Sequence, residues 1–181
     1  MPEVHAVDHT GYTAGSVEAG IADTRLELGA GYRPSYGFTH QDINPGNHIE
    51  IVCDCRDMNT PGRWQEVRAT HLLEHFSYWE TVNVLKNWRN LLVAGGSLYL
   101  EVPSMTGQMA AYQEHRIDDR ELVRLVYADQ DYAENFHYAG FTRAILTEDL
   151  EKAGFVNVRV EEYDLILTAW GSSSLQSAPT R

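Results

Sequence analysis

The stretch LELGAGYRPSYGFTHQDINP, residues 26–45, decides the fold. It begins like a β-strand and runs into Gly29 and Gly31, and glycines after a strand are typical of a turn that approaches a nucleotide-containing cofactor. Asp42 follows Gly31 by eleven residues. The acid of a dinucleotide-binding fingerprint lies about 20 residues past its glycines, beyond a whole helix. The shorter connection predicts a loop or a single turn instead of a full first helix.

The composition is that of a soluble globular domain, with 181 residues, 43% hydrophobic and 22% charged. A net charge of −12 without a run of lysine or arginine disfavours nucleic acid as a partner. No segment has the length and apolarity of a membrane span, and the N-terminus lacks the pattern of a secretory signal. Cys53 and Cys55 are the only cysteines. They predict buried thiols in a cytoplasmic protein, and no metal site.

The chain divides into three parts. Residues 1–23 predict an N-terminal arm or a short covering helix, residues 24–171 a single domain, and residues 172–181 a disordered tail. Within the domain, residues 104–141 interrupt the alternation of strands and helices with helical segments and an aromatic loop. We interpret this segment as a lid or substrate-binding insertion.

The best-marked helix is expected to start at Ser77, because Glu80 three residues later completes a capping box. Trp79 and Trp88 fall on its apolar stripe, which predicts that both pack in the core. Alternating segments before and after this helix predict strands, and the last two strands form an antiparallel hairpin. The fold class is therefore α/β: a three-layer Rossmann-like sandwich, mostly parallel, with an antiparallel C-terminal edge strand and a first helix that is shortened or absent.

In such sheets ligands bind at the carboxyl ends of the strands, where the strand order switches. Gly29 and Gly31 permit positive backbone angles and close approach of a ligand. Asp42 has two carboxylate oxygens for the hydroxyls of a ribose, and a turn-capping role is the alternative. Asp54 can accept from an adenine amine, and the amide of Cys55 can donate to a ring nitrogen. Together these residues predict an adenosine pocket.

At this point the chain resembles the class I, Rossmann-like S-adenosylmethionine-dependent methyltransferases, in particular a small type 11-like branch. The resemblance covers residues 24–170. It rests on the ordered segments LELGAG, QDINP, CDCRDM, ATHLLEHF, LKNWRNLLVAGGSLYLEVPS and FHYAGFTRAILTEDLEKAGF. Two segments depart from the family pattern: MNTPGRW follows the adenine-side aspartate, and Val93-Ala94 precedes the Gly-Gly turn. The first departure bears on the wall of the adenine pocket.

The resemblance implies that the cofactor is S-adenosylmethionine, which has no phosphate and so needs no helix N-terminus at the glycine turn. It also implies a set of cofactor-binding residues. These are Glu27, Gly29, Ala30, Gly31, Asp42, Ile43, Asp54, Cys55, His71 and Leu72.

The catalytic candidates are histidines, because an oxygen acceptor needs a base for its proton. His71 lies where the resemblance places the sulfonium, and His137 lies in the aromatic loop that can close over a substrate. His75 is a third candidate base, and its alternative is to pack or cap at the start of the helix. Glu74 is expected to have a structural role there.

The predicted function is methyl transfer to a small molecule or glycan, at oxygen. The alternatives are methylation of a protein or nucleic acid, another transfer from an adenosyl donor, and a non-catalytic cofactor-binding domain. The oligomeric state is left open.

Overall fold

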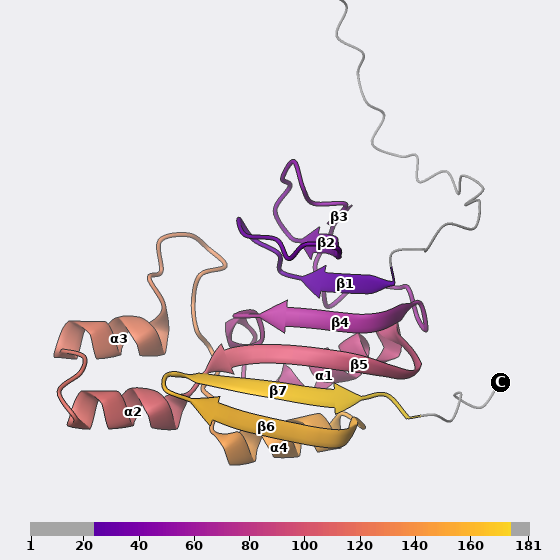
Figure 1. Ribbon diagram of the computed structural model, residues 1–181. Coiled ribbons are helices and arrows are strands. Elements are labelled where there is room, and N and C mark those ends of the chain that lie inside the picture. Colours follow the sequence, from indigo (N-terminus) through magenta and orange to yellow (C-terminus); the bar gives the residue numbers. More distant parts are fainter. Residues whose placement is uncertain (1–23, 175–181) are drawn as a thin grey trace, which may run out of the picture.

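A computed structural model describes residues 24–174, so the predicted N-terminal arm and residues 175–181 of the predicted tail lie outside the described residues. The described chain forms one seven-stranded sheet with the order β3-β2-β1-β4-β5-β7-β6 (Figure 1). Its strands are β1 (Arg25–Leu28), β2 (Thr39–Asp42), β3 (Ile51–Val52), β4 (Trp64–Thr70), β5 (Leu92–Pro103), β6 (Val156–Tyr163) and β7 (Ile166–Ser172).

The direction of the strands confirms the predicted sheet. Strands β3, β2, β1, β4 and β5 pair in parallel, whereas β7 pairs antiparallel with both β5 and β6. The chain builds outward from β1 to β3 on one side and from β4 to β5 on the other. The strand order therefore switches between β1 and β4, which is where a ligand site is expected in an open α/β sheet.

Helices cover one face of this sheet. The described helices are the 3-10 helix η1 (Leu73–His75) and the α-helices α1 (Thr81–Leu91), α2 (Met105–Gln113), α3 (Asp119–Tyr127) and α4 (Arg143–Lys152). The helices α1 and α4 pack on one face of the sheet, whereas α2 and α3 lie beyond the arrowheads of β4 and β5 (Figure 1). None of these helices is long and apolar enough to span a membrane.

The core lies between the sheet and the helices α1 and α4. Alternate residues of the strands, such as Leu26 and Leu100, are fully buried there together with Trp88. Trp79 was expected beside Trp88 but is 85% exposed. The reason is that α1 begins at Thr81, not at Ser77. The side chain of Ser77 does bond Glu80, at 2.7 Å, but it closes a turn ahead of the helix.

The opposite face carries no helix within residues 24–174. The connections that follow β1, β2 and β3 are turns and loops, so the absence of a first helix is confirmed and the expected third layer is not formed by the described helices. Arginine–aromatic stacking covers part of this face instead. The Arg68 guanidinium lies 4.7 Å from the Phe38 ring centroid and 4.8 Å from that of Tyr99. Trp170 packs edge-on against Tyr99.

The C-terminal boundary lies two residues later than predicted. Ser172 is the last residue of β7 and pairs with Ser97 in β5. Ser173 is buried, and its backbone amide donates to the carbonyl of Gly96 at 2.8 Å. The expected start of the tail at residue 172 is therefore wrong, because Ser172 is part of the inner strand β7 and Ser173 bonds Gly96 in β5.

Candidate functional site

The glycine turn after β1 has the backbone shape that the sequence predicted. Gly29 and Gly31 have φ angles of +62° and +55°, which side chains other than glycine rarely adopt. A Cβ atom on Gly29 would lie 2.8 Å from Cδ1 of Leu72, in the turn that follows β4. The two turns at the switch point thus pack so closely that only glycine fits at position 29. Between Gly29 and Gly31, the backbone amide of Ala30 donates to the carbonyl of Gln41.

Asp42, at the end of β2, holds this turn. Its carboxylate accepts from the backbone amides of Gly31, at 2.9 Å, and Asn44, at 2.8 Å. A carboxylate has about four lone-pair positions, so two remain for a hydroxyl donor. Ile43, next in the chain, is 47% exposed and offers an apolar surface. His48, which the sequence interpretation did not single out, lies with Nε2 2.7 Å from the carbonyl oxygen of Gly31.

Asp54 is engaged within the chain. Its carboxylate accepts from Arg56 through the backbone amide at 2.8 Å and through Nη2 at 2.6 Å, and these bonds hold the pKa of Asp54 below its ordinary value. Arg56 also reaches Glu80 at 3.1 Å. An adenine amine would therefore share Asp54 with Arg56. Cys55 is buried in the core, where burial raises the pKa of its thiol to about 12, so only its backbone is suited to a ligand.

Glu27 lies on the helix-free face and orders the loop after the glycine turn. It is buried, and it accepts from the amide of Ser35 at 2.7 Å and from the hydroxyl of Ser35 at 2.6 Å. His40 lies close by, with Nε2 3.7 Å from the Glu27 carboxylate. In this arrangement Glu27 shapes the loop over residues 31–38, because its two oxygens bind Ser35.

The turn after β4 presents His71 from a strained backbone. His71 has a φ of +51°, which is uncommon for a residue other than glycine, and its amide bonds the carbonyl of Glu101 at 3.0 Å. Its Nδ1 lies 3.3 Å from Oε1 of Glu74. That contact raises the pKa of His71 above its ordinary value. Strain of this kind often marks a functional site, where the surrounding structure imposes it.

The insertion between β5 and α4 docks onto this turn. The amides of Tyr138 and Ala139 both donate to the carbonyl of Glu74, at 2.8 and 3.2 Å. Nδ1 of His75 lies 3.1 Å from the carbonyl of Phe136. These bonds place His137 against Glu74, with 4.0 Å between Nε2 and Oε1. The predicted lid residue is thus held beside the residues that follow β4.

Four side chains therefore meet: His71, Glu74, His75 and His137. The sequence interpretation named the three histidines as separate candidate bases, with packing or capping as the alternative for His75, and expected Glu74 to have a structural role. The spacing His71-x-x-Glu74-His75, which zinc enzymes also use, is the signal that could have drawn attention to them. His71 and His137 differ electrostatically. Burial lowers the pKa of His137, whereas Glu74 raises the pKa of His71.

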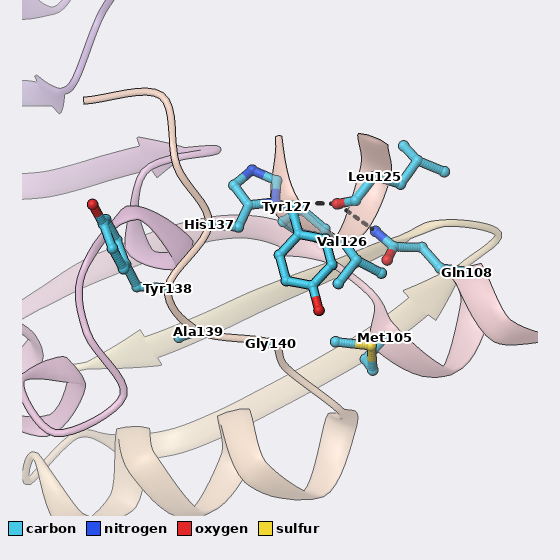
Figure 2. A pocket seen from close by; sticks show the side chains of 10 residues that line it. Met105, Gln108, Leu125, Val126, Tyr127, His137, Tyr138, Ala139 and Gly140 are labelled. Carbon is cyan, nitrogen blue, oxygen red and sulfur yellow. Dashed lines mark hydrogen bonds between the residues drawn. The ribbon is translucent and has the colours of Figure 1, made fainter. Parts of the chain in front are cut away.

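A small cavity lies within the insertion, and His137 is one of the residues that line it. Its volume is about 140 Å³, below the ~300–1,000 Å³ typical of sites for drug-sized ligands. Figure 2 shows the dashed bond between His137 and the carbonyl of Leu125, at 3.1 Å, while the other ring nitrogen points away from the cavity. The side chains that line it include Met105, Gln108, Val126 and Tyr127.

The loop between α3 and His137 carries Tyr132. The pKa of the Tyr132 phenol is raised by burial and by charged or ionisable groups within electrostatic range, which include Asp131, Tyr32 and Asp42. Tyr132 therefore senses groups near the carboxyl ends of β1 and β2, although it belongs to the insertion.

Comparison with known proteins gives the class of fold. No family model and no curated protein matches the sequence. Among solved structures, the fold is similar to that of an S-adenosylmethionine-dependent methyltransferase from Methanosarcina mazei, with a TM-score of 0.61 and 16% identity. The alignment covers 84% of this chain and 92% of that one.

Two further structures extend the comparison. One is 1,6-didemethyltoxoflavin-N1-methyltransferase from Burkholderia thailandensis with bound S-adenosylhomocysteine, with a TM-score of 0.57, 17% identity and coverage of 83% and 70%. The other is a possible exported protein from Bordetella parapertussis, with a TM-score of 0.59, 15% identity and coverage of 84%. Our chain spans 62% of the length of that protein. At these identities the comparisons show that the chain has the Rossmann-like fold of S-adenosylmethionine-dependent methyltransferases.

Proposed function

We propose that the protein is an S-adenosylmethionine-dependent methyltransferase. The observation that carries this proposal is the convergence at the switch point between β1 and β4. A glycine turn fastened by Asp42 lies on one side, and a histidine–carboxylate cluster covered by the insertion lies on the other. The fold shared with methyltransferases supports the same conclusion.

The glycine turn fits the adenosyl cofactor, because the backbone at Gly29 and Gly31 leaves no side chain in the way of a ligand. Asp42 would accept from the ribose hydroxyls with its remaining lone pairs, and Ile43 would pack beside the adenine. The adenine amine fits less well, since Arg56 already binds Asp54. When bound, the cofactor supplies an activated methyl group on its sulfonium.

The chain's own residues would align the acceptor and remove its proton. The lowered pKa of His137 leaves its imidazole neutral at pH 7, with a nitrogen able to accept a proton. His71 lies on the opposite side of Glu74 and is half-exposed, so it is the second candidate base. The insertion would exclude water from the reacting groups.

The acceptor that we propose is a small molecule or a glycan, methylated at oxygen. The net charge of −12 argues against a nucleic acid. A cytoplasmic location belongs to the same proposal. A domain that binds the cofactor without turnover is the second candidate, because Arg56 occupies Asp54.

Calorimetry with S-adenosylmethionine and S-adenosylhomocysteine tests the proposal. We expect both to bind, and labelled methyl transfer to at least one member of a panel of hydroxylated small molecules and sugars. Failure of both ligands to bind at millimolar concentration would refute the proposed function. Binding without transfer to any acceptor would favour the non-catalytic domain.

The variant His137→Gln separates chemistry from binding. We expect cofactor affinity to change by less than about twofold and turnover to fall by roughly 10²-fold or more, as for the loss of a general base. His115→Asn is the matched control, since His115 is exposed on the same insertion and asparagine tolerates its φ of +57°. A loss of cofactor binding in His137→Gln would make His137 a structural residue.

A further inference from the structure

Glu74 is a buried carboxylate with unused bonding capacity. Its side chain is 1% exposed, and Oε2 has no hydrogen-bond partner anywhere in residues 24–174. Oε1 has His71 at 3.3 Å and His137 at 4.0 Å. A buried carboxylate oxygen without a hydrogen-bond partner is unfavourable and persists only where the surrounding fold imposes it. The free oxygen is therefore suited to a cationic ligand.

The two neighbouring imidazoles are oriented to meet the same need. Nδ1 of His75 lies 3.1 Å from the carbonyl of Phe136, and Nδ1 of His137 lies 3.1 Å from the carbonyl of Leu125. A carbonyl can only accept, so Nδ1 of each ring must carry the hydrogen. In the neutral rings Nε2 is then an unprotonated nitrogen with a free lone pair. Histidines that bind metals are commonly fixed in this way by a backbone carbonyl.

Ligand atoms of the two histidines lie close to the carboxylate, and for His137 Nε2 is 4.0 Å from Oε1 of Glu74. One ligand atom each from Glu74, His75 and His137 can be chosen so that all lie within 4.8 Å of one another. The rings of His75 and His137 are packed edge to face, 5.0 Å apart between centroids. Direct coordination at about 2.0–2.2 Å would draw these ligand atoms to roughly 3.4 Å from one another, so the cluster would contract around the ion.

We propose that Glu74, His75 and His137 bind a divalent transition-metal cation of the Zn²⁺ class. Two neutral imidazoles and one carboxylate suit Zn²⁺ and similar ions, whereas Mg²⁺ and Ca²⁺ favour ligand sets made of oxygen alone. Three protein ligands leave a tetrahedral ion with one open position. His71 adjoins the cluster, because its Nδ1 lies 3.3 Å from Oε1 of Glu74.

A bound cation would make the proposed methyl transfer more specific, because it favours an acceptor whose hydroxyl oxygen can bind the ion. A hydroxyl oxygen at the open position would lose its proton more readily, because the ion stabilises the resulting oxyanion. His137 would then be a ligand, and His71 would be left to accept the proton. This role rests on the proposed function. Binding of the cation does not, because it depends only on the three side chains.

The test is a titration of the full-length chain with Zn²⁺ after removal of metals by a chelator. Calorimetry or competition with a chromophoric chelator, without any cofactor, should show one cation per chain at micromolar affinity or tighter. Glu74→Gln keeps the shape of the side chain but replaces one carboxylate oxygen by an amide NH2 group. It should lower the Zn²⁺ affinity by about 100-fold. His115→Asn and Cys53→Ser are matched controls and should bind as the unaltered chain does.

Two results would overturn the proposal: no saturable binding to the unaltered chain, or equal affinity in Glu74→Gln. If Glu74→Gln fails to fold, His75→Gln carries the same test, and near-UV circular dichroism shows which variants are native. Cofactor calorimetry on the same samples separates the two proposals. Loss of cation binding alone contradicts this inference, whereas loss of S-adenosylmethionine binding alone contradicts the proposed function.

Discussion

The two sides of the switch point treat their carboxylates in opposite ways. On the side of the glycine turn, Asp42 accepts two backbone amides and Asp54 binds Arg56. On the side of the insertion, Glu74 is buried and retains an oxygen without a partner among the described residues. On the glycine-turn side the carboxylates are therefore already hydrogen-bonded within the chain. A ligand there must share each carboxylate with the groups that bind it. The side of the insertion retains bonding capacity that a ligand can use.

On the side of the glycine turn, the largest effect on cofactor affinity should come from replacing Asp42. Asp42→Ala removes the acceptor for the amides of Gly31 and Asn44 and the proposed acceptor for the ribose. We expect S-adenosylmethionine affinity to fall at least tenfold, or about 1.4 kcal/mol, in calorimetry. The exposed Asp57→Ala is the control and should leave affinity unchanged. Unchanged affinity in Asp42→Ala would remove Asp42 from the cofactor site.

A pair of buried glutamates sharpens the comparison by stability. Glu27→Gln weakens the bonds to Ser35, so we expect a loss of about 1–2 kcal/mol in unfolding free energy from chemical denaturation. Glu74→Gln, measured with a chelator present, should change the free energy of unfolding by less than about 1 kcal/mol, because Oε2 makes no hydrogen bond within residues 24–174 that the substitution could remove. A loss in Glu74→Gln larger than that in Glu27→Gln would show that Glu74 is a structural residue.

The smallest effect is a pH dependence at His40. Burial lowers the pKa of His40, but the bond to the carbonyl of Ser35 and the charges of Glu50 and Glu27 outweigh it and raise the pKa above 6.5. Protonation in the folded state therefore stabilises the protein fully below about pH 6.5, and this contribution is lost as the pH rises through the raised pKa.

Denaturation of His40→Gln and the unaltered chain at two pH values measures this contribution. The variant should lose more stability at pH 5.5 than at pH 8.5. An equal loss at both values would mean that His40 acts only through its hydrogen bonds.

Local patterns in the sequence predicted much of the fold. The two glycines and the short spacing to Asp42 predicted the turn and the missing first helix, since both depend on backbone length and φ alone. The alternation before the C-terminus predicted the antiparallel hairpin. Trp79 was misplaced, because helical periodicity was read through a turn that ends before Thr81.

The site was harder to predict, because its partners lie far apart in the chain. Asp54 pairs with Arg56 two residues away, a local contact that the expectation of an adenine ligand overlooked. The bond between His75 and Phe136 joins residues 61 positions apart. Only the docking of the insertion creates that pairing, so no local pattern around Glu74 could reveal its buried and unpartnered oxygen.

The short strands β1, β2 and β3, at one end of the sheet, also bear on its dynamics. Strand β3 has only two residues, β1 and β2 have four each, and no described helix backs them on the face that carries Glu27. Segments with so few supporting contacts open locally at a lower free energy than the rest of a domain. We therefore expect the unit that holds Asp42 to open at a lower free energy than β4, β5 and β7. A ligand that binds only when β1, β2 and β3 are folded would stabilise these strands. Saturation with such a ligand should therefore slow amide hydrogen exchange in them.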